Sequence, residues 1–223
     1  MGSSAPSSRR RFAVRPDSGV QRPRVALVPD LIEFETRRLR LVAWQERHIA
    51  PLAAMNADPE VMRYFPATLT QEQTRASVEM WRNQFAERGW SNWAVELKHS
   101  GEFIGFVGLS IPRHQLPFSP CVEVGWRLAR RFWGHGYATE GARASLAVGF
   151  GQLGLAEIVS FTALDNLPSR AVMERIGMRN TGRDFEHPAV PDGSPLRRHC
   201  LYVIRHVAER GARTRDPERA PTA

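Results

Sequence analysis

The segment from Arg131 to Gly136, Arg-Phe-Trp-Gly-His-Gly, constrains the fold more than any other part of this sequence. It separates an extended apolar run, Cys121 to Leu128, from a helical pattern that opens at Tyr137. A strand that ends in a glycine-bearing loop and enters a helix leaves several backbone N–H groups unpaired and pointing the same way. Glycine lets such a backbone approach an anion closely. A Gly-x-Gly pair by itself is usually an ordinary turn, but this context predicts a phosphate cradle.

Apolar periodicity and capping signals predict seven strands and four helices. Strands are expected near Leu39–Ala43, Asn92–Lys98, Phe103–Leu109, Cys121–Leu128, Glu157–Ala163, Arg179–Phe185 and Arg197–Val203. Helices are expected near Glu46–Ala57, Thr70–Gly89, Tyr137–Phe150 and Asn166–Arg175. The expected order, β-α-α-β-β-β-α-β-α-β-β, contains both strands and helices, so the fold class is α/β (α+β).

Two polar tails flank this pattern. Residues 1–30 are rich in Ser, Pro and Arg and cannot bury enough apolar surface to order themselves, so we expect a disordered leader. Residues 208–223 have the same character and are expected to form a flexible tail. A chain of 223 residues then leaves one domain, residues 31–207, with an adequate core.

Several segments around the glycine loop resemble those of a known family. The motif Arg131-x-x-Gly134-x-Gly136, with Glu-Val-Gly-Trp before it and Tyr-Ala-Thr-Glu after it, resembles the acetyl-CoA loop of the GNAT superfamily of N-acetyltransferases. Three further segments resemble its ribosomal-protein-acetyltransferase-like (RimJ/RimL) branch: Thr36–Leu41, Asp58–Phe65 and Asn166-x-x-Ser169 followed by Ile176–Met178. The similarity extends from about Phe34 to His206.

This resemblance implies a GNAT fold, in which a mixed, mostly antiparallel seven-stranded sheet is splayed between strands four and five and flanked by about four helices. Acetyl-CoA, as co-substrate, would enter between Cys121–Leu128 and Glu157–Ala163, where splayed strands expose backbone groups that an amide-bearing arm can pair with. The residues assigned to the donor are Trp126, Arg127 and Leu128 through their backbone, the loop residues Arg131, Gly134, His135, Gly136, Tyr137 and Ala138, and Asn166.

Acetyl transfer to an amine needs a base that takes a proton from the attacking nitrogen. By resemblance, Glu123 on the cofactor-binding strand takes that proton through water, although a strand carboxylate can equally serve in a salt bridge. Glu186 and His187, near the presumed substrate mouth, are the substitutes.

The departing thiolate needs a proton, and here the chain differs from much of the superfamily. Many members carry a tyrosine seven residues beyond the asparagine that matches Asn166, but this position is Met173, which has no proton to donate. RimL-like proteins use a serine three residues after that asparagine, and Ser169 occupies this place. The alternative is that Asn166 caps a helix and Ser169 lies in its first turn.

The predicted function is acetyl-CoA-dependent N-acetylation of a primary amine, a protein N-terminus or a small molecule, by direct attack in a ternary complex. No cysteine is placed to form an acetyl-enzyme, although Cys121, unlike Cys200, lies close to the site in the sequence. The family's acceptor pocket lies between the first two helices and the last hairpin, a region that supplies Trp44, Met55, Tyr64, Phe65, Trp81 and Trp90. Homodimers are frequent in the family, but nothing in this sequence specifies an interface.

Two rival functions are a non-catalytic acyl-CoA sensor, which would keep the glycine loop, and a basic RNA- or ribosome-associated module. The net charge is +8, but Lys98 is the only lysine among 31 basic residues, which suggests a codon bias rather than a nucleic-acid surface. A sensor would not need Glu123 and Ser169.

Cysteine and histidine spacings match no metal site, and no apolar run reaches membrane-spanning length, so we expect a soluble, cytoplasmic protein without metal.

Overall fold

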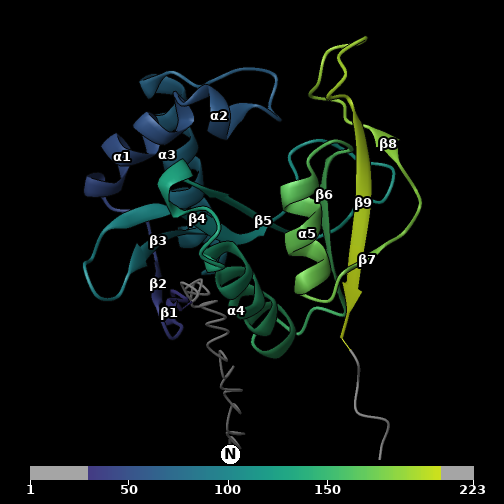
Figure 1. Ribbon diagram of the computed structural model, residues 1–223. Coiled ribbons are helices and arrows are strands. Elements are labelled where there is room, and N and C mark those ends of the chain that lie inside the picture. The colour runs from purple at the N-terminus through teal and green to yellow at the C-terminus, as the bar shows by residue number, and fades with distance from the viewer. Residues whose placement is uncertain (1–29, 207–223) are drawn as a thin grey trace, which may run out of the picture.

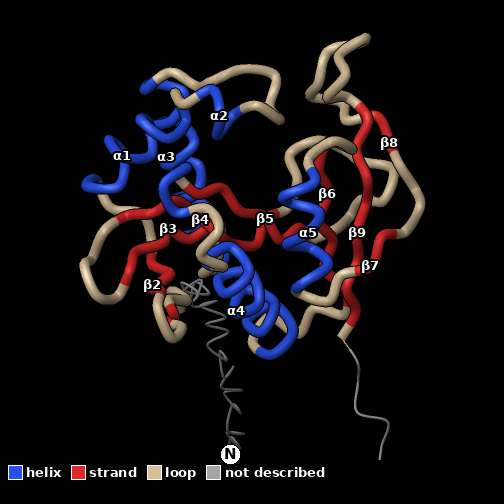
Figure 2. Tube along the Cα trace, in the orientation of Figure 1, coloured by secondary structure: helices blue, strands red, loops and turns tan. Residues whose placement is uncertain are grey.

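The computed structural model describes residues 30–206, which form one sheet with helices on both of its faces (Figures 1 and 2). The expected flexible tail, and the expected disordered leader apart from Asp30, lie outside these residues. None of the described helices is long and apolar enough to cross a bilayer.

The element order agrees with the predicted one and adds three short elements. The strands are β1 (Phe34–Glu35), β2 (Leu39–Val42), β3 (Asn92–Leu97), β4 (Phe103–Ser110), β5 (Glu123–Leu128), β6 (Glu157–Ala163), β7 (Arg179–Asn180), β8 (Phe185–Glu186) and β9 (Arg198–Arg205). The α-helices are α1 (Ile49–Asn56), α2 (Pro59–Met62), α3 (Gln71–Arg88), α4 (Tyr137–Gly151) and α5 (Leu167–Arg175). Single 3-10 turns, η1 (Glu46–His48) and η2 (Arg130–Phe132), precede α1 and the glycine loop.

The sheet therefore has nine strands where seven were predicted, and there are five α-helices instead of four. The strand predicted over 179–185 is divided because Gly182 turns the chain at φ +69°, and Asn180 Oδ1 accepts a hydrogen bond from its N–H at 2.9 Å. The extra helix α2 begins where Asp58 Oδ1 accepts from the Glu60 N–H at 2.9 Å, with Pro59 in the first turn.

The sheet is splayed between β5 and β6, as the resemblance implies. These two strands are parallel and share one register pair, Glu123 with Val159, whereas β5 pairs with β4 from Glu123 to Leu128. On the far side, β6 pairs with β9 along its whole length. Figure 1 shows the two strands diverging, with α1, α2 and α3 over one half of the molecule and α5 over the other. Helix α4 comes after β5 in the chain and packs on β4 and β5.

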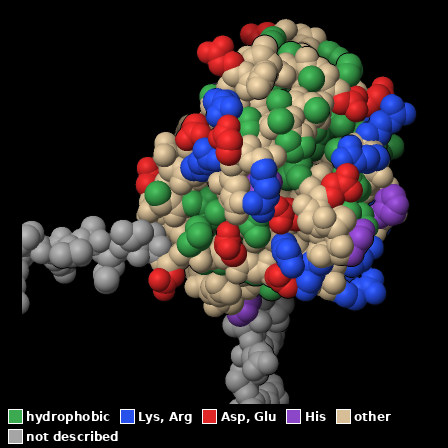
Figure 3. All heavy atoms as spheres, turned by 90° about the vertical axis from the view of Figure 1, so that its left-hand side faces the viewer, with side chains coloured by type: hydrophobic (Ala, Val, Ile, Leu, Met, Phe, Trp, Pro, Cys, Tyr) green, Lys and Arg blue, Asp and Glu red, His purple; other side chains and the backbone are tan. Residues whose placement is uncertain are grey.

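The first half of the molecule consists of β1 to β5 with α1, α2 and α3. Aromatic side chains fill the space under α1 and α3, where Trp44 and Trp81 stack with ring centroids 4.8 Å apart. Trp93 on β3 is fully buried. This packing fixes β4 and β5 rigidly beside the opening, and Figure 3 shows the outer face of this half, where acidic and basic side chains are interspersed.

Candidate active site

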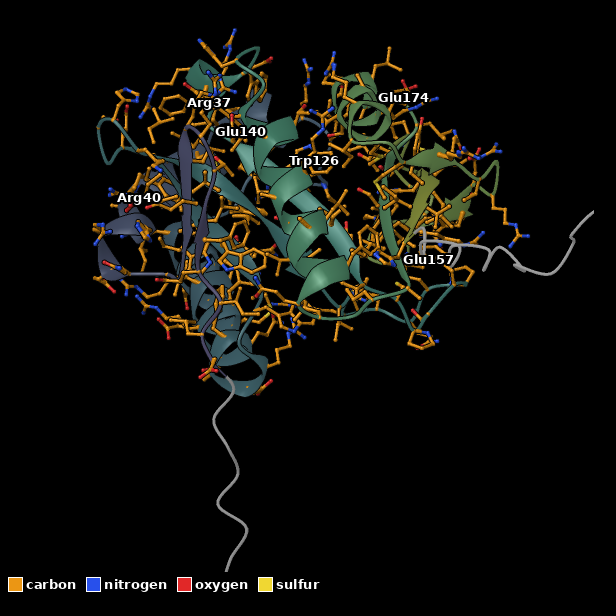
Figure 4. All side chains as sticks on the ribbon, turned by 90° about the horizontal axis from the view of Figure 1, so that it is seen from below. Arg37, Arg40, Trp126, Glu140, Glu157 and Glu174 are labelled. Carbon is orange, nitrogen blue, oxygen red and sulfur yellow. The ribbon has the colours of Figure 1, made fainter. Side chains whose placement is uncertain are left out.

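A cavity of about 910 Å³ lies where β5 and β6 diverge. Ten of the twelve residues assigned from the sequence line it: Glu123, Trp126, Arg127, Leu128, Gly134, Gly136, Tyr137, Ala138, Asn166 and Ser169. The structure thus brings together the proposed base, the strand edge, the glycine loop and the start of α5. Figure 4 shows Trp126 beside α4, on the side that faces the second half of the molecule.

The glycine loop has the backbone conformation that an anion cradle needs. Gly134 and Gly136 have φ of +78° and +76°, in the left-handed region that glycine adopts without strain. Gly136 directly precedes α4, and no side chain caps the first N–H groups of this fifteen-residue helix. These N–H groups point toward the loop and carry the positive end of the helix dipole, so they fit a phosphate or pyrophosphate.

An acidic residue fastens this loop to the first half of the sheet. Glu140 accepts hydrogen bonds from Thr36 Oγ1 at 2.6 Å, from the Arg38 backbone N–H at 2.9 Å and from Arg38 Nε at 2.6 Å. Burial raises the pKa of Glu140, but these hydrogen bonds outweigh it and leave the pKa below its ordinary value. Arg38 also donates to the His135 carbonyl at 2.9 Å, so the loop is held from outside the cavity. Glu140 lies near Arg37 at one end of α4 in Figure 4.

The side chains of two assigned loop residues, Arg131 and His135, do not line the cavity. Arg131 Nη2 donates to Glu102 Oε1 at 2.7 Å, and His135 Nδ1 lies 2.8 Å from the Trp133 carbonyl oxygen. Neither side chain lines the cavity, so any contact that they make with a donor would come from their backbone or from outside it.

The edge of β5 offers backbone groups beyond the point where β6 leaves it. The Val159 N–H donates to the Val122 carbonyl at 2.9 Å, which holds the two strands together at one end of the opening. At the other end, Trp133 Nε1 donates to the Leu128 carbonyl at 2.7 Å, so one of the assigned acceptor groups already has a partner. An extended amide-bearing chain has room between these two points.

Glu123 is the most perturbed carboxyl group at the site. Burial raises its pKa to about 8, against a smaller lowering effect from Ser110, its partner across β4 and β5. None of the ion pairs within residues 30–206 includes Glu123, so the alternative role in a salt bridge has no support there. A half-buried carboxylate that titrates near neutral pH can exchange a proton with an amine.

The two substitute bases differ in position. Glu186 forms an ion pair with Arg197 at 2.9 Å and does not line the cavity. His187 lines it, with its ring 4.8 Å from that of His199. Burial, together with His199 and His114, lowers the pKa of His187 to about 4, so its imidazole is neutral at pH 7.

The start of α5 shows the capping arrangement. Asn166 Oδ1 accepts from the Ser169 N–H at 3.3 Å, and its Nδ2 donates to Thr162 Oγ1 at 2.8 Å. Asn166 is therefore the N-cap, with one amide hydrogen left over. The Ser169 hydroxyl makes no hydrogen bond within residues 30–206 and lines the cavity, while Met173 is buried. Asn166 therefore caps α5 through the backbone of Ser169, and this cap leaves the Ser169 hydroxyl free for proton donation.

The region assigned to the acceptor divides into core and cavity. Tyr64 and Phe65 line the cavity, whereas Trp44, Met55, Trp81 and Trp90 are buried in the core. Sequence reasoning did not single out His199, nor the Arg127 side chain. The period of two along β5 could have identified the second, because Glu123, Gly125 and Arg127 share one face.

Neither cysteine is suited to carry an acetyl group. Burial and the nearby Glu123 raise the pKa of Cys121 to about 11, and burial raises that of Cys200. Cys200 Sγ donates to the Thr162 carbonyl at 3.5 Å. Neither side chain lines the cavity.

Comparison with known proteins gives a consistent result. The family model described as acetyltransferase (GNAT) domain matches residues 38–179. The uncharacterized protein YkkB of Bacillus subtilis is 38% identical over 146 residues, which cover 64% of this chain and 83% of YkkB. The FsC-acetyl coenzyme A-N(2)-transacetylase of Aspergillus fumigatus is 34% identical over 166 residues, 71% of this chain and 69% of that protein.

Solved structures show the same fold. A GNAT-family acetyltransferase from Bacillus anthracis superposes with a TM-score of 0.65 at 27% identity, over 78% of this chain and 98% of its own. Three structures described as ribosomal-protein acetyltransferases, RimL among them, share the fold at 16% to 19% identity.

Proposed function

Because this chain belongs to the acetyltransferase (GNAT) family, we propose that it transfers the acetyl group of acetyl-CoA directly to a primary amine while both substrates are bound. The chain is an N-acetyltransferase. The observation that carries the proposal is the position of Glu123: a carboxyl group with a pKa of about 8 lines the same cavity as the glycine loop.

The residues around the opening fit the donor. The loop at Gly134 and Gly136, with the uncapped start of α4, would hold the pyrophosphate of CoA. The edge of β5 would pair with the pantetheine arm as a further strand would. When bound, acetyl-CoA supplies a thioester whose carbonyl carbon is open to attack by an amine.

Glu123 matches the proton chemistry of an amine. An α-amine with a pKa near 8 is about one tenth neutral at pH 7, whereas a lysine amine is neutral in well under one molecule in a thousand. A base with a pKa of about 8 takes a proton from such an amine with little free-energy cost, directly or through water. This favours an N-terminal amine, or a small amine of similar pKa, as the acceptor.

Ser169 would complete the reaction on the other side of the thioester. The amine nitrogen bonds to the carbonyl carbon and the carbon–sulfur bond breaks. The sulfur takes a proton from the Ser169 hydroxyl, which regains one from water, while the proton of the amine goes to Glu123. The hydroxyl is available because the backbone N–H of Ser169, not its side chain, completes the helix cap.

Direct transfer is favoured over a covalent intermediate. Both cysteines have raised pKa values and neither side chain lines the cavity, so neither thiolate is placed to take the acetyl group. The related enzymes named above act on ribosomal proteins or on an FsC amine, which keeps both protein N-termini and small molecules as acceptors.

The test is release of the CoA thiol from acetyl-CoA in the presence of peptides with free N-termini and of small amines. We expect amine-dependent release, with the acetylated amine formed in equal amount. Tight binding of acetyl-CoA with no release by any amine would instead identify a sensor. The Glu123→Gln variant is the matched control, since it keeps the shape of the side chain and removes the base.

A further inference from the structure

The side chain of Arg127 faces the acceptor side of the cavity, although the sequence assigned only its backbone to the donor. In the β4–β5 register, Arg127 is opposite Phe106 and Glu123 is opposite Ser110. Side chains two and four residues apart on a strand share a face, so Arg127 lies on the face of Glu123, while Trp126 lies on the other. Both Glu123 and Arg127 line the cavity.

The first half of the molecule holds the Arg127 guanidinium in a fixed position. Its Nη1 donates to Asn56 Oδ1 at 2.8 Å, and Asn56 Nδ2 in turn donates to Thr74 Oγ1 at 3.1 Å. The guanidinium carbon lies 4.1 Å from the ring centroid of Phe65 and 5.4 Å from that of Phe106. These contacts come from α1, β4 and the segment after α2, and Thr74 on α3 supports Asn56, so the charge cannot turn toward solvent without breaking them.

This held charge has no carboxylate partner among residues 30–206. Its Nε is buried there without a hydrogen bond, and Nη2 makes none. Burial lowers the pKa of Arg127 to about 10, but the group remains charged at neutral pH. Arg63, at the rim of the same cavity, forms an ion pair with Glu60 at 3.8 Å. A buried charge without a counter-ion is costly, so Arg127 is set up to receive an anion.

We propose that Arg127 binds a carboxylate group of the acceptor, so that the substrate is a primary amine that also carries a carboxylate. The inference rests on the proposed function. Nη2, the guanidinium nitrogen that is neither hydrogen-bonded within residues 30–206 nor fully buried, can donate a charge-assisted hydrogen bond to a carboxylate oxygen. Glu123 and Arg127 are four residues apart on β5, roughly 13 Å between their Cα atoms at 3.3 Å per residue, so several bonds separate the amine from the carboxylate.

The test compares acceptors that differ only in this charge. One pair is glycylglycine and its primary amide, which keep an α-amine; the other is two peptide amides with a free N-terminal serine followed by glutamate or by glutamine. We expect the wild-type chain to prefer the acid of at least one pair by about 10- to 100-fold in kcat/KM, the range of a charge-assisted hydrogen bond. The pair that shows the preference identifies the source of the carboxylate.

Three variants test whether Arg127 causes the preference. In Arg127→Gln, which removes the charge and keeps a polar side chain, the preference should fall to within about threefold, and in Arg127→Lys to an intermediate value. Arg63→Gln removes the same charge at the rim and should keep the wild-type preference. A wild-type preference below about threefold in both pairs, or one that persists in Arg127→Gln, would overturn the proposal.

A binding measurement separates this proposal from the proposed function. With CoA bound, glycylglycine should raise the melting temperature of the wild type more than its amide does, and Arg127→Gln should lose this difference. An equal effect of the two ligands on the wild type contradicts the carboxylate site even if no amine is acetylated. Failure of every amine to release CoA, with the binding difference present, contradicts only the proposed function.

Discussion

The raised pKa of Glu123 makes a quantitative prediction about stability as well as about catalysis. In the unfolded chain this carboxyl group ionises at its ordinary pKa of 4.5, whereas in the folded chain it holds its proton up to a pKa of about 8. The folded state therefore binds more protons between these pH values, so the group lowers the free energy of unfolding as pH rises through that window. At about 1.4 kcal/mol per tenfold change, the full difference sets an upper limit of about 5 kcal/mol.

The Glu123→Gln variant removes this cost, because glutamine is neutral at every pH and has nearly the same shape. Since the carboxyl group lines a cavity that water can enter, we expect about 2 to 3 kcal/mol of the upper limit to be realised. At pH 5 the variant and the wild type should be almost equally stable. At pH 9 the variant should be the more stable by that amount, although it is inactive or nearly so.

Urea denaturation of both chains without CoA, followed by tryptophan fluorescence at pH 5, 7 and 9, measures the difference. Every other titrating group is common to the two chains and cancels. A stability difference that stays constant between pH 5 and 9 would refute the raised pKa. The rate profile gives a second reading: kcat/KM of the wild type should rise with pH and level off above about 8.

Three further outcomes follow from the site. Ser169→Ala should lower kcat by about 100-fold without changing the melting temperature, because the cap uses the backbone N–H; nearly full turnover at all pH values would leave only the capping role. Gly136→Ala should lower the free energy of unfolding by about 1 kcal/mol, because φ there is +76°. It should also raise the KM for acetyl-CoA. An unchanged KM in a stopped assay would show that the loop does not bind the donor. His187 stays neutral in the folded chain down to a pKa of about 4, but in the unfolded chain it binds a proton below pH 6.5, so wild-type stability should fall as pH drops toward 4. His187→Gln should lessen that fall by about 1 kcal/mol in the same urea measurement. An equal fall in both chains would contradict the lowered pKa.

The sequence predicted the elements that have strong local signals. Thr70 forms a capping box with Gln73, and Gly89 ends α3 in the left-handed region, so both ends of that helix were readable from residue types. The cradle at Gly134 and Gly136 was predicted for the same reason. The strand expected over 179–185 was wrong in its interior, because its residues are compatible with extended chain and only Gly182 marks the turn.

The parts of the site that depend on distant contacts were not predictable. Nothing near Arg127 in the sequence indicates that its partner is Asn56, 71 residues earlier. The pKa of Glu123 depends on how closely other elements surround it, and the pairing of Arg131 with Glu102 depends on the β4 and β5 register. The family resemblance assigned residues to roles, but it did not say which atoms already have partners.

The single register pair between β5 and β6 has a consequence for how the protein opens. One residue pair, Glu123 with Val159, and the packing of α4 connect two hydrogen-bonded blocks, β1 to β5 and β6 to β9. Without a bound donor, we expect amide hydrogens along the free edge of β5 to exchange with deuterium faster than those between β6 and β9. A ligand that bridges the gap would slow this exchange and make the two blocks unfold together, so binding of the donor would change the cooperativity of the whole domain.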